Sequence, residues 1–151
     1  MNVGDLMTRE VSTCNSESDL ETIARLMWDK DCGSIPVLSN SGTPIGIITD
    51  RDIAMGCALN HKALWEMRAE EILNNRELYT CRPDDDIKTA LRLMSDHHIH
   101  RLPVVDNNGS LQGILSIDDV IARAKSGPGK KVRDLNYDDT MQTLKHICTH
   151  H

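Results

Sequence analysis

Residues 13–53 read TCNSESDLETIARLMWDKDCGSIPVLSNSGTPIGIITDRDI, and residues 80–120 repeat this pattern as TCRPDDDIKTALRLMSDHHIHRLPVVDNNGSLQGILSIDDV. The two stretches align without a gap at a spacing of 67 positions, with 15 identities among 41 positions. A fixed internal period indicates two copies of one structural unit. The chain of 151 residues is therefore expected to contain two small repeats of one fold.

Each copy has the same order of predicted elements: a short strand, a helix, a β-hairpin and a second helix. In the first copy these are a strand at 11–14, a helix opening with the capping box Ser18-Asp19-Leu20-Glu21, hairpin strands at 35–38 and 45–48, and a helix from Thr49. In the second copy they are a strand at 78–81, a helix from Pro83-Asp84, hairpin strands at 102–105 and 112–115, and a helix from Ser116. This order predicts a mixed α/β (α+β) fold of two tandem β-α-β-β-α units, packed sheet to sheet with pseudo-twofold symmetry.

The repeat also predicts the domain organisation. The expected bounds are 1–60 for the first unit, 61–69 for a connector, 70–125 for the second unit and 126–151 for a linker and a C-terminal helix. Within the tail, Met141, Leu144 and Ile147 recur at helical spacing. A helix over 137–148 is therefore expected to dock on the pair of units or on a second subunit.

Composition and charge narrow the classes of function. The formal net charge is −6, and the chain has two Trp, two Tyr and no Phe, which argues against a nucleic-acid partner. No segment has the ~18–20 apolar residues of a membrane span, so a cytoplasmic protein without a membrane partner is expected. No catalytic triad, P-loop or metal motif is present, and the five Cys form no C-x-x-C pair. We therefore expect reduced thiols and no enzymatic activity.

A seven-residue pattern closes each copy where the last strand enters the last helix. It reads GIITDRD at 46–52 and GILSIDD at 113–119, so both copies contain G-h-h-[ST]-x-x-D, where h is apolar. The start of a helix favours an anion, and the carboxylate can accept two hydrogen bonds from the vicinal diol of a ribose. Thr49 with Asp52, and Ser116 with Asp119, are therefore candidate nucleotide sites. The alternative is that each pair only caps its own helix, because [ST]-x-x-[DE] is also a capping box.

These junctions, together with DLMT at 5–8, SIPV at 34–37 and RLPV at 101–104, resemble the cystathionine-β-synthase (CBS) domain pair, or Bateman module. The resemblance extends from Val3 to about Lys125. It implies an adenosyl ligand such as ATP, ADP or AMP in the cleft between the two units, with the aspartate on the ribose hydroxyls. The ligand-binding residues that it implies in this chain are Thr49, Asp52, Ser116, Asp119, His100, Arg101, Leu102, Ser34, Ile35, Pro36, Pro103, Thr13 and Thr80.

The two copies differ just before the proline of the first hairpin strand. His100-Arg101 provides cationic groups for a phosphate, whereas the equivalent Gly33-Ser34 does not. We therefore expect the phosphate end of the nucleotide to lie toward His100 and Arg101. The alternative for the stretch 97–101 is a solvated helix end that enters a strand.

Two further groups of residues have simpler interpretations. A metal is not expected, although a terminal site can be drawn from His146, Cys148, His150 and His151. The linker cations are expected to be solvated, with contact to a phosphate or a partner as the alternative; they are Lys125, Lys130, Lys131 and Arg133.

The resulting hypothesis is a stand-alone regulatory module that binds an adenine nucleotide and signals through its conformation or through an unidentified effector protein. A homodimer is expected, because the family that the chain resembles commonly pairs two modules. The alternative is a stress-linked or redox-linked structural protein, with metal-based or thiol-based chemistry and vestigial nucleotide clefts.

Overall fold

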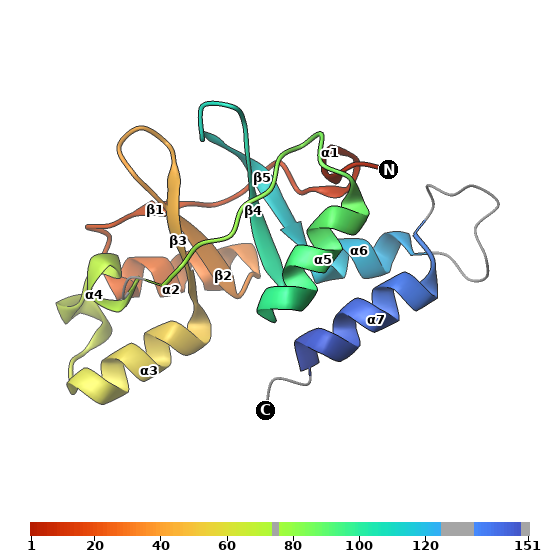
Figure 1. The fold of residues 1–151 in the computed structure, drawn as a ribbon. Coiled ribbons are helices and arrows are strands. Elements are labelled where there is room, and N and C mark those ends of the chain that lie inside the picture. Colours follow the sequence, from red (N-terminus) through yellow and green to blue (C-terminus); the bar gives the residue numbers. More distant parts are fainter. Residues whose placement is uncertain (74–75, 125–134, 149–151) are drawn as a thin grey trace. The chain divides into compact units, whose positions relative to one another are not determined.

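The chain folds around two groups of buried side chains, and its contacts divide it into two units. The structure, a computed structural model, describes residues 1–73, 76–124 and 135–148. One unit is Val11–Leu78, here called the α2 unit. The other combines Met1–Glu10 with Tyr79–His151 and is here called the α5 unit. The predicted mixed α/β fold of repeated units with a C-terminal helix is confirmed (Figure 1).

The α2 unit is built on a three-stranded sheet of order β1-β2-β3. β1 (Cys14–Asn15) is parallel to β2 (Ser34–Leu38), which forms an antiparallel hairpin with β3 (Pro44–Thr49). The helices of this unit are α2 (Leu20–Lys30), α3 (Asp50–Asn60), the 3-10 turn η1 (Leu64–Glu66) and α4 (Ala69–Leu73). α2 buries Leu20, Ile23 and Met27, which the i, i+3, i+7 spacing places on one helix face.

The α5 unit repeats this plan and adds a helix. β4 (Arg101–Val105) and β5 (Leu111–Ser116) form an antiparallel hairpin, and Cys81 makes a parallel bridge to Val104 where the α2 unit has β1. The helices are α1 (Val3–Leu6), α5 (Ile87–His97), α6 (Ile117–Arg123) and α7 (Tyr137–Cys148). α7 lies beside α5, as Figure 1 shows, and it also contacts α6. The predicted C-terminal helix is confirmed.

The short helices α1 and α4 exchange repeats. α1 precedes the first repeat but packs on the second, and α4 precedes the second repeat but packs on the first. The Gly4 amide of α1 donates to the Pro83 carbonyl oxygen at 2.8 Å, and the Ala69 amide of α4 donates to the Ser18 carbonyl oxygen at 2.9 Å. Each unit therefore joins one sequence repeat to the short helix that precedes the other. The domain bounds predicted above follow the sequence repeat and stay a prediction.

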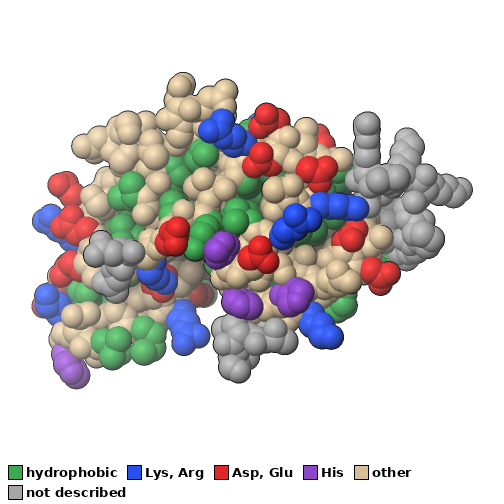
Figure 2. Space-filling view, viewed as in Figure 1, with side chains coloured by type: hydrophobic (Ala, Val, Ile, Leu, Met, Phe, Trp, Pro, Cys, Tyr) green, Lys and Arg blue, Asp and Glu red, His purple; other side chains and the backbone are tan. Residues whose placement is uncertain are grey.

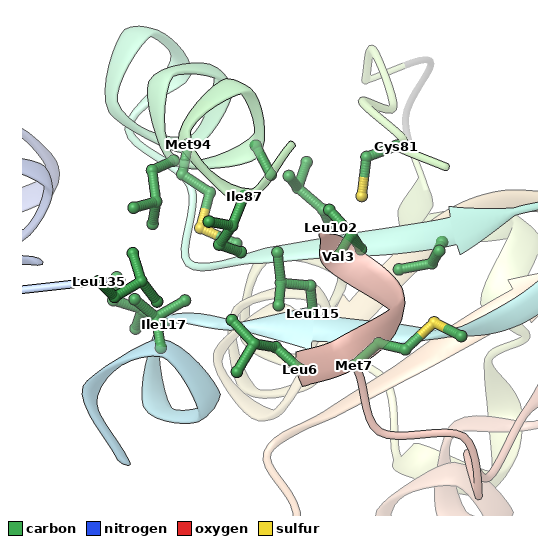
Figure 3. Packing of buried hydrophobic residues seen from close by; sticks show 14 of the residues in the cluster. Val3, Leu6, Met7, Cys81, Ile87, Met94, Leu102, Leu115, Ile117 and Leu135 are labelled. Atoms are coloured by element: carbon green, nitrogen blue, oxygen red, sulfur yellow. The ribbon is translucent and has the colours of Figure 1, made fainter. Parts of the chain in front are cut away.

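Each unit has its own hydrophobic core. In the α5 unit, Val3 and Leu6 of α1 point toward Leu102 and Leu115 of the hairpin, as Figure 3 shows. The core of the α2 unit gathers around Ile35 and Ile48 of its hairpin, with Leu20, Ile23, Met27, Val37, Ile53, Met67, Ala69 and Ile72. The centre of each hairpin is therefore fixed by packing, and the ends of its strands are left to carry the candidate site.

Glycines allow the segments that contain α1 and α4 to approach the hairpins closely. A Cβ atom on Gly113 would lie 2.5 Å from the Thr8 carbonyl oxygen, and one on Gly46 would lie 2.5 Å from Cδ2 of Leu73. Thr8 and Ile114 also exchange two backbone hydrogen bonds, at 2.8 and 2.9 Å. Thr8, two residues after α1, is thus held against β5, beside the junction with α6.

Some predicted boundaries are wrong by a few residues. α2 is capped by Asp19, whose side chain accepts from the Thr22 amide, and not by Ser18. α5 begins at Ile87 with Asp86 as its cap, later than the predicted Pro83-Asp84 start. The strand predicted at 11–14 overlaps the two-residue β1 only at Cys14, and the strand predicted at 78–81 is reduced to a single bridge at Cys81.

The surface is mixed in charge. Acidic and basic side chains alternate over the described part of the face that Figure 2 shows. Among the described residues, no helix combines the length and the apolar character that crossing a membrane requires.

Candidate functional site

The two predicted junctions fold in the same way, and both form capping boxes. In the α2 unit, Oδ2 of Asp52 accepts from the Thr49 amide at 2.9 Å, and Oγ1 of Thr49 accepts from the Asp52 amide at 3.1 Å. In the α5 unit, Oδ2 of Asp119 accepts from the Ser116 amide at 3.0 Å and from the Ser116 hydroxyl at 2.9 Å. Thr49 and Ser116 are the N-caps of α3 and α6. The capping interpretation is therefore confirmed for both pairs.

Capping uses one carboxylate oxygen, and the second oxygen differs between the units. Oδ1 of Asp52 forms an ion pair with Nη2 of Arg76 at 3.1 Å. Burial raises the pKa of Asp52, but hydrogen bonds from Arg76 and Thr49 outweigh it, so the pKa lies below its ordinary value of 3.8. Asp52 is therefore held as a carboxylate with both oxygens engaged.

The second oxygen of Asp119 has a weaker partner. Its Oδ1 lies 3.4 Å from Oγ1 of Thr8, the residue that is bonded to β5. Within the described part of the chain Asp119 forms no ion pair. A neutral hydroxyl at this distance is easily replaced by another donor, so Oδ1 of Asp119 is the more accessible acceptor of the two units.

The hairpin register brings the residues before each proline beside the helix cap. Ser34 pairs with Thr49, and the Asp50 amide donates to the Gly33 carbonyl oxygen at 3.1 Å. In the α5 unit, Arg101 pairs with Ser116, and the Ile117 amide donates to the His100 carbonyl oxygen at 2.9 Å. The structure thus brings His100 and Arg101 next to the Ser116–Asp119 cap, although they are 15 or more positions away in sequence.

The remaining candidate residues divide into buried and exposed groups. Ile35 and Leu102 are fully buried core residues, and the prolines that follow them, Pro36 and Pro103, are buried as well. Thr13 and Thr80 are exposed and directly precede Cys14 and Cys81, which bond to the first hairpin strand. The buried residues position the hairpins, so a direct contact with a ligand is expected mainly from the polar members of the set.

Two residues at the junctions were missed by the sequence interpretation. These are Arg76, which pairs with Asp52, and Thr8, which contacts Asp119. For Arg76 the sequence offers a hint, because the spacing of 67 extends upstream and aligns it with Arg9; Thr8 aligns with a different residue, Asn75. The segments are too short to show a period of their own, so their proximity to the aspartates could not be inferred.

Two cavities lie among the described residues. Neither is lined by Asp52 or Asp119, but Gly33 and Asp50 of the Asp52 junction line the first. One, of about 430 Å³, lies between α2 and α3 and carries two acidic residues; it is lined by Ala24, Met27, Trp28, Asp31, Cys32, Gly33, Asp50 and Ile53. The other, of about 440 Å³, lies between α5 and α7; it is lined by Lys88, Leu91, Arg92, Ser95, Asp96, Asp139, Gln142, Thr143 and His146. The first would repel a phosphate, since its charged side chains are acidic.

The histidines at the end of α5 have structural partners. His97 stacks on Tyr79 with ring centroids 3.7 Å apart. Nδ1 of His98 lies 2.7 Å from the His146 carbonyl oxygen, and Nδ1 of His146 lies 2.8 Å from Oγ of Ser95. His97 and His98 are nevertheless exposed, as expected for a solvated helix end. His98 also helps to dock the end of α7 on α5.

The terminal metal site and the basic linker are only partly covered by the structure. His150 and His151 lie outside the described residues, as do Lys125, Lys130, Lys131 and Arg133. Among residues 1–73, 76–124 and 135–148, no three His, Cys, Asp or Glu side chains gather as metal ligands.

The cysteines offer little reactivity at the two strand positions that the repeat shares. Burial raises the pKa of Cys14 to about 11. Burial, with the nearby negative charge of Asp85, raises the pKa of Cys81 to about 12. Both therefore remain thiols at neutral pH, which makes them poor nucleophiles.

Comparison with known families identifies the repeat. The model of the CBS domain matches residues 3–57 and again 69–126. The chain belongs to the CBS domain family. The two CBS matches include both capping boxes and both short helices, and they end before α7.

Several known proteins resemble this chain in sequence or in structure. CBS domain-containing protein YhcV of Bacillus subtilis is 33% identical over 124 residues, which cover 82% of this chain and 86% of that protein. The homoserine O-acetyltransferase of Methanohalophilus mahii is 40% identical over 127 residues, 84% of this chain but 25% of the enzyme. The crystal structure of the CBS domain pair of protein MJ0100, in complex with 5′-methylthioadenosine and S-adenosyl-L-methionine, superimposes with a TM-score of 0.72. It is 27% identical, and the match covers 81% of this chain and 94% of that one. The chain thus spans about a quarter of the length of the acetyltransferase.

Proposed function

We propose that this chain is a regulatory CBS domain pair that binds an adenosyl ligand, either an adenine nucleotide (ATP, ADP or AMP) or a related adenosyl compound. The aspartate of each capping box accepts hydrogen bonds from the ribose hydroxyls. Thr49 and Ser116 position those aspartates, and His100 and Arg101 meet the phosphate of a nucleotide. The chain regulates through its conformation or through a partner protein, and it is not itself an enzyme.

The observation that carries this proposal is the geometry of Asp119. Its Oδ2 is fixed by the amide and the hydroxyl of Ser116, while Oδ1 has only a 3.4 Å contact to Thr8. A carboxylate held by one oxygen presents the other in a fixed direction, which lowers the entropy cost of binding a diol. Capping and ribose binding are therefore compatible, because they use different oxygens.

The chemistry around Asp119 supports a ligand with a phosphate. Arg101 lies opposite Ser116 across the β4–β5 ladder, and His100 is bonded to the first residue of α6. Arginine binds phosphate through two parallel N–H groups. The adenosyl compounds bound to the CBS pair of MJ0100 support the ribose part of the proposal, since that pair is 27% identical to this chain.

The regulatory role, the homodimer and the choice against thiol chemistry rest on other observations. The regulatory role is supported by the match of the family model to both repeats. A homodimer is supported by exposed apolar side chains of the α2 unit, notably Trp28, Leu59 and Trp65. The thiol-based alternative is disfavoured at Cys14 and Cys81, because their raised pKa values keep them protonated.

Thermal unfolding in the presence of adenosine, 5′-methylthioadenosine, AMP and ATP tests the proposal. A ligand at 100 times its Kd stabilises the folded state by about 2.7 kcal/mol, which is a rise in Tm of several degrees for a chain of this size. Asp119→Asn keeps an oxygen that can cap α6 but replaces the other acceptor by an amide donor, so it should reduce the rise without a large loss of basal Tm. The absence of any rise with all four compounds contradicts the proposal.

A further inference from the structure

We infer that Arg76 is a specificity-determining residue of the Asp52 site, which it closes to neutral nucleosides and opens to phosphorylated ones. This inference deepens the proposed function and rests on it. Arg76 is not among the residues that the resemblance to CBS pairs implied. It follows α4, which packs on the first repeat, and its guanidinium reaches Asp52 from outside the hairpin.

The ion pair occupies the oxygen that a ribose needs. Oδ2 of Asp52 is held by the Thr49 amide at 2.9 Å, and Oδ1 by Nη2 of Arg76 at 3.1 Å. A vicinal diol donates two hydrogen bonds and would compete with Arg76 for Oδ1. Binding of a nucleoside at Asp52 therefore requires that the guanidinium moves or shares its acceptor.

Arg76 has the freedom to move, while Asp52 does not. The Arg76 side chain is 57% exposed, whereas that of Asp52 is 17% exposed and belongs to the capping box of α3. An exposed arginine loses little when it changes partner, since water solvates it in either position. The carboxylate thus stays in place and the cation is the mobile member of the pair.

The displaced guanidinium gains a new binding partner only when the ligand carries a phosphate. Gly33-Ser34 replaces the His100-Arg101 of the other unit, so the α2 unit has no cation at that position. Asp50 also lies in the first turn of α3 and adds a negative charge next to Asp52, although Arg51 between them is positive. A nucleoside gains nothing from the released Arg76, whereas a phosphate can accept two charge-assisted hydrogen bonds from it.

The α5 unit provides an internal comparison. The repeat aligns Arg9 with Arg76, but Nη2 of Arg9 lies 3.5 Å from the Gly4 carbonyl oxygen, and Thr8 contacts Asp119 instead. Among residues 1–73, 76–124 and 135–148, no ion pair has to break at Asp119. Arg76 therefore makes the first site selective for the charge of the ligand, and the second site lacks this device.

Site-resolved NMR titration tests the role of Arg76. The backbone amides of Asp52 and Asp119 are followed in labelled protein while adenosine or ATP is added, which gives a separate affinity at each junction. In Arg76→Gln, the affinity for adenosine at Asp52 should rise about two- to fivefold, because an exposed ion pair no longer competes. The affinity for ATP at Asp52 should fall about tenfold, because a charge-assisted contact is lost. Affinities at Asp119 should stay unchanged.

Two control variants separate Arg76 from a general effect of charge. Arg51→Gln removes the same charge one residue before Asp52, and Arg51 forms no ion pair among the described residues. It should change ATP binding less than Arg76→Gln and should leave adenosine binding unchanged. Arg76→Lys keeps the charge without the two parallel N–H groups, and it should recover part of the ATP affinity.

The outcomes distinguish this inference from the proposed function. If adenosine and ATP change in the same direction in Arg76→Gln, or if Arg51→Gln reproduces both changes, the inference is overturned and ligand binding stands. If neither compound shifts the Asp52 or the Asp119 amide in the unmodified protein, the proposed function fails and the inference fails with it. Opposite changes confined to Asp52 support both.

Discussion

The α2 and α5 units have the same capping box but differ in what contacts the second oxygen of its aspartate. Asp52 has the guanidinium of Arg76 at 3.1 Å, and Asp119 has the hydroxyl of Thr8 at 3.4 Å. The difference shows that a repeated fold can keep the element that fixes a carboxylate while it changes the group that competes for it. Under the proposed function, the two junctions would then prefer different ligands.

The units also differ in how their last helix is covered. α6 contacts α7, whereas α3 buries only Ile53 of its 11 residues. The added helix makes the α5 unit the larger of the two. In the α2 unit, Met55 and Leu59 of α3 remain exposed. The following predictions test this comparison between the units.

The largest effect is expected where α7 docks on the α5 unit. Ile147 is fully buried in the core of that unit, so Ile147→Ala should reduce the free energy of unfolding by about 2–5 kcal/mol. Met141 is 62% exposed on the same helix, so Met141→Ala should change the free energy of unfolding by less than about 0.5 kcal/mol. Urea unfolding followed by circular dichroism measures both. Equal effects would show that α7 does not pack as described.

A second comparison uses the matched glycines of the two hairpins. An added Cβ on Gly113 would collide with the Thr8 carbonyl oxygen, which belongs to the backbone, whereas one on Gly46 would meet only the end of the Leu73 side chain. Gly113→Ala should therefore lower the free energy of unfolding by about 1–3 kcal/mol. Gly46→Ala should lower it by clearly less, because the Leu73 side chain can change rotamer. Thermal unfolding of the two variants under the same conditions decides this. A larger loss for Gly46→Ala would contradict the packing of residue 8 against β5.

A third comparison concerns the caps themselves. Thr49→Ala and Ser116→Ala each remove a hydroxyl that accepts a hydrogen bond from a backbone amide. The donors are the amides of Asp52, at 3.1 Å, and Asp119, at 3.2 Å. Each should cost about 1 kcal/mol of stability. Because the Ser116 hydroxyl also donates to Asp119, Ser116→Ala should in addition lower the affinity for adenosyl ligands. Unfolding by urea gives the first quantity and calorimetric titration with AMP the second; unchanged affinity would contradict the role of Ser116 in positioning Asp119.

The smallest effect is the pH dependence of the Asp52–Arg76 pair. The folded-state pKa of Asp52 lies below 3.8, so its stabilising contribution is present at neutral pH and is lost as the pH falls through that lower pKa. The pKa should rise in Arg76→Gln, because the hydrogen bond and the charge of the guanidinium are removed. Titration of the Asp52 carboxyl carbon by NMR measures the shift in both proteins. An unchanged pKa would contradict the ion pair.

The sequence alone predicts those parts of the structure that depend on local pattern. The two hairpins, the caps at Thr49 and Ser116 and the final helix follow from periodicity and turn residues. The proximity of Arg101 to Ser116 follows as well, because the register of a hairpin fixes which residues lie opposite each other. These features require knowledge of only a few neighbouring residues.

The features that the sequence did not reveal depend on contacts over long distances in the chain. α1 and α4 have four and five residues, too few to display a helical period. α1 packs on the second repeat and α4 on the first, so each lies far in sequence from the residues that it contacts. Arg76 is 24 positions from Asp52 and Thr8 is 111 positions from Asp119. The competitors for the second carboxylate oxygen follow these two short helices in the chain, so they could not be placed from local pattern alone.

The measurement that tests the central claim most directly compares AMP with its 2′,3′-dideoxy analogue by calorimetric titration. If the carboxylate oxygen left over from helix capping holds the sugar, the protein should prefer AMP by at least about tenfold, the worth of hydrogen bonds to a charged acceptor. Asp119→Asn should remove much of that preference while the protein stays folded. Equal affinities for AMP and the dideoxy analogue in the unmodified protein would contradict the account.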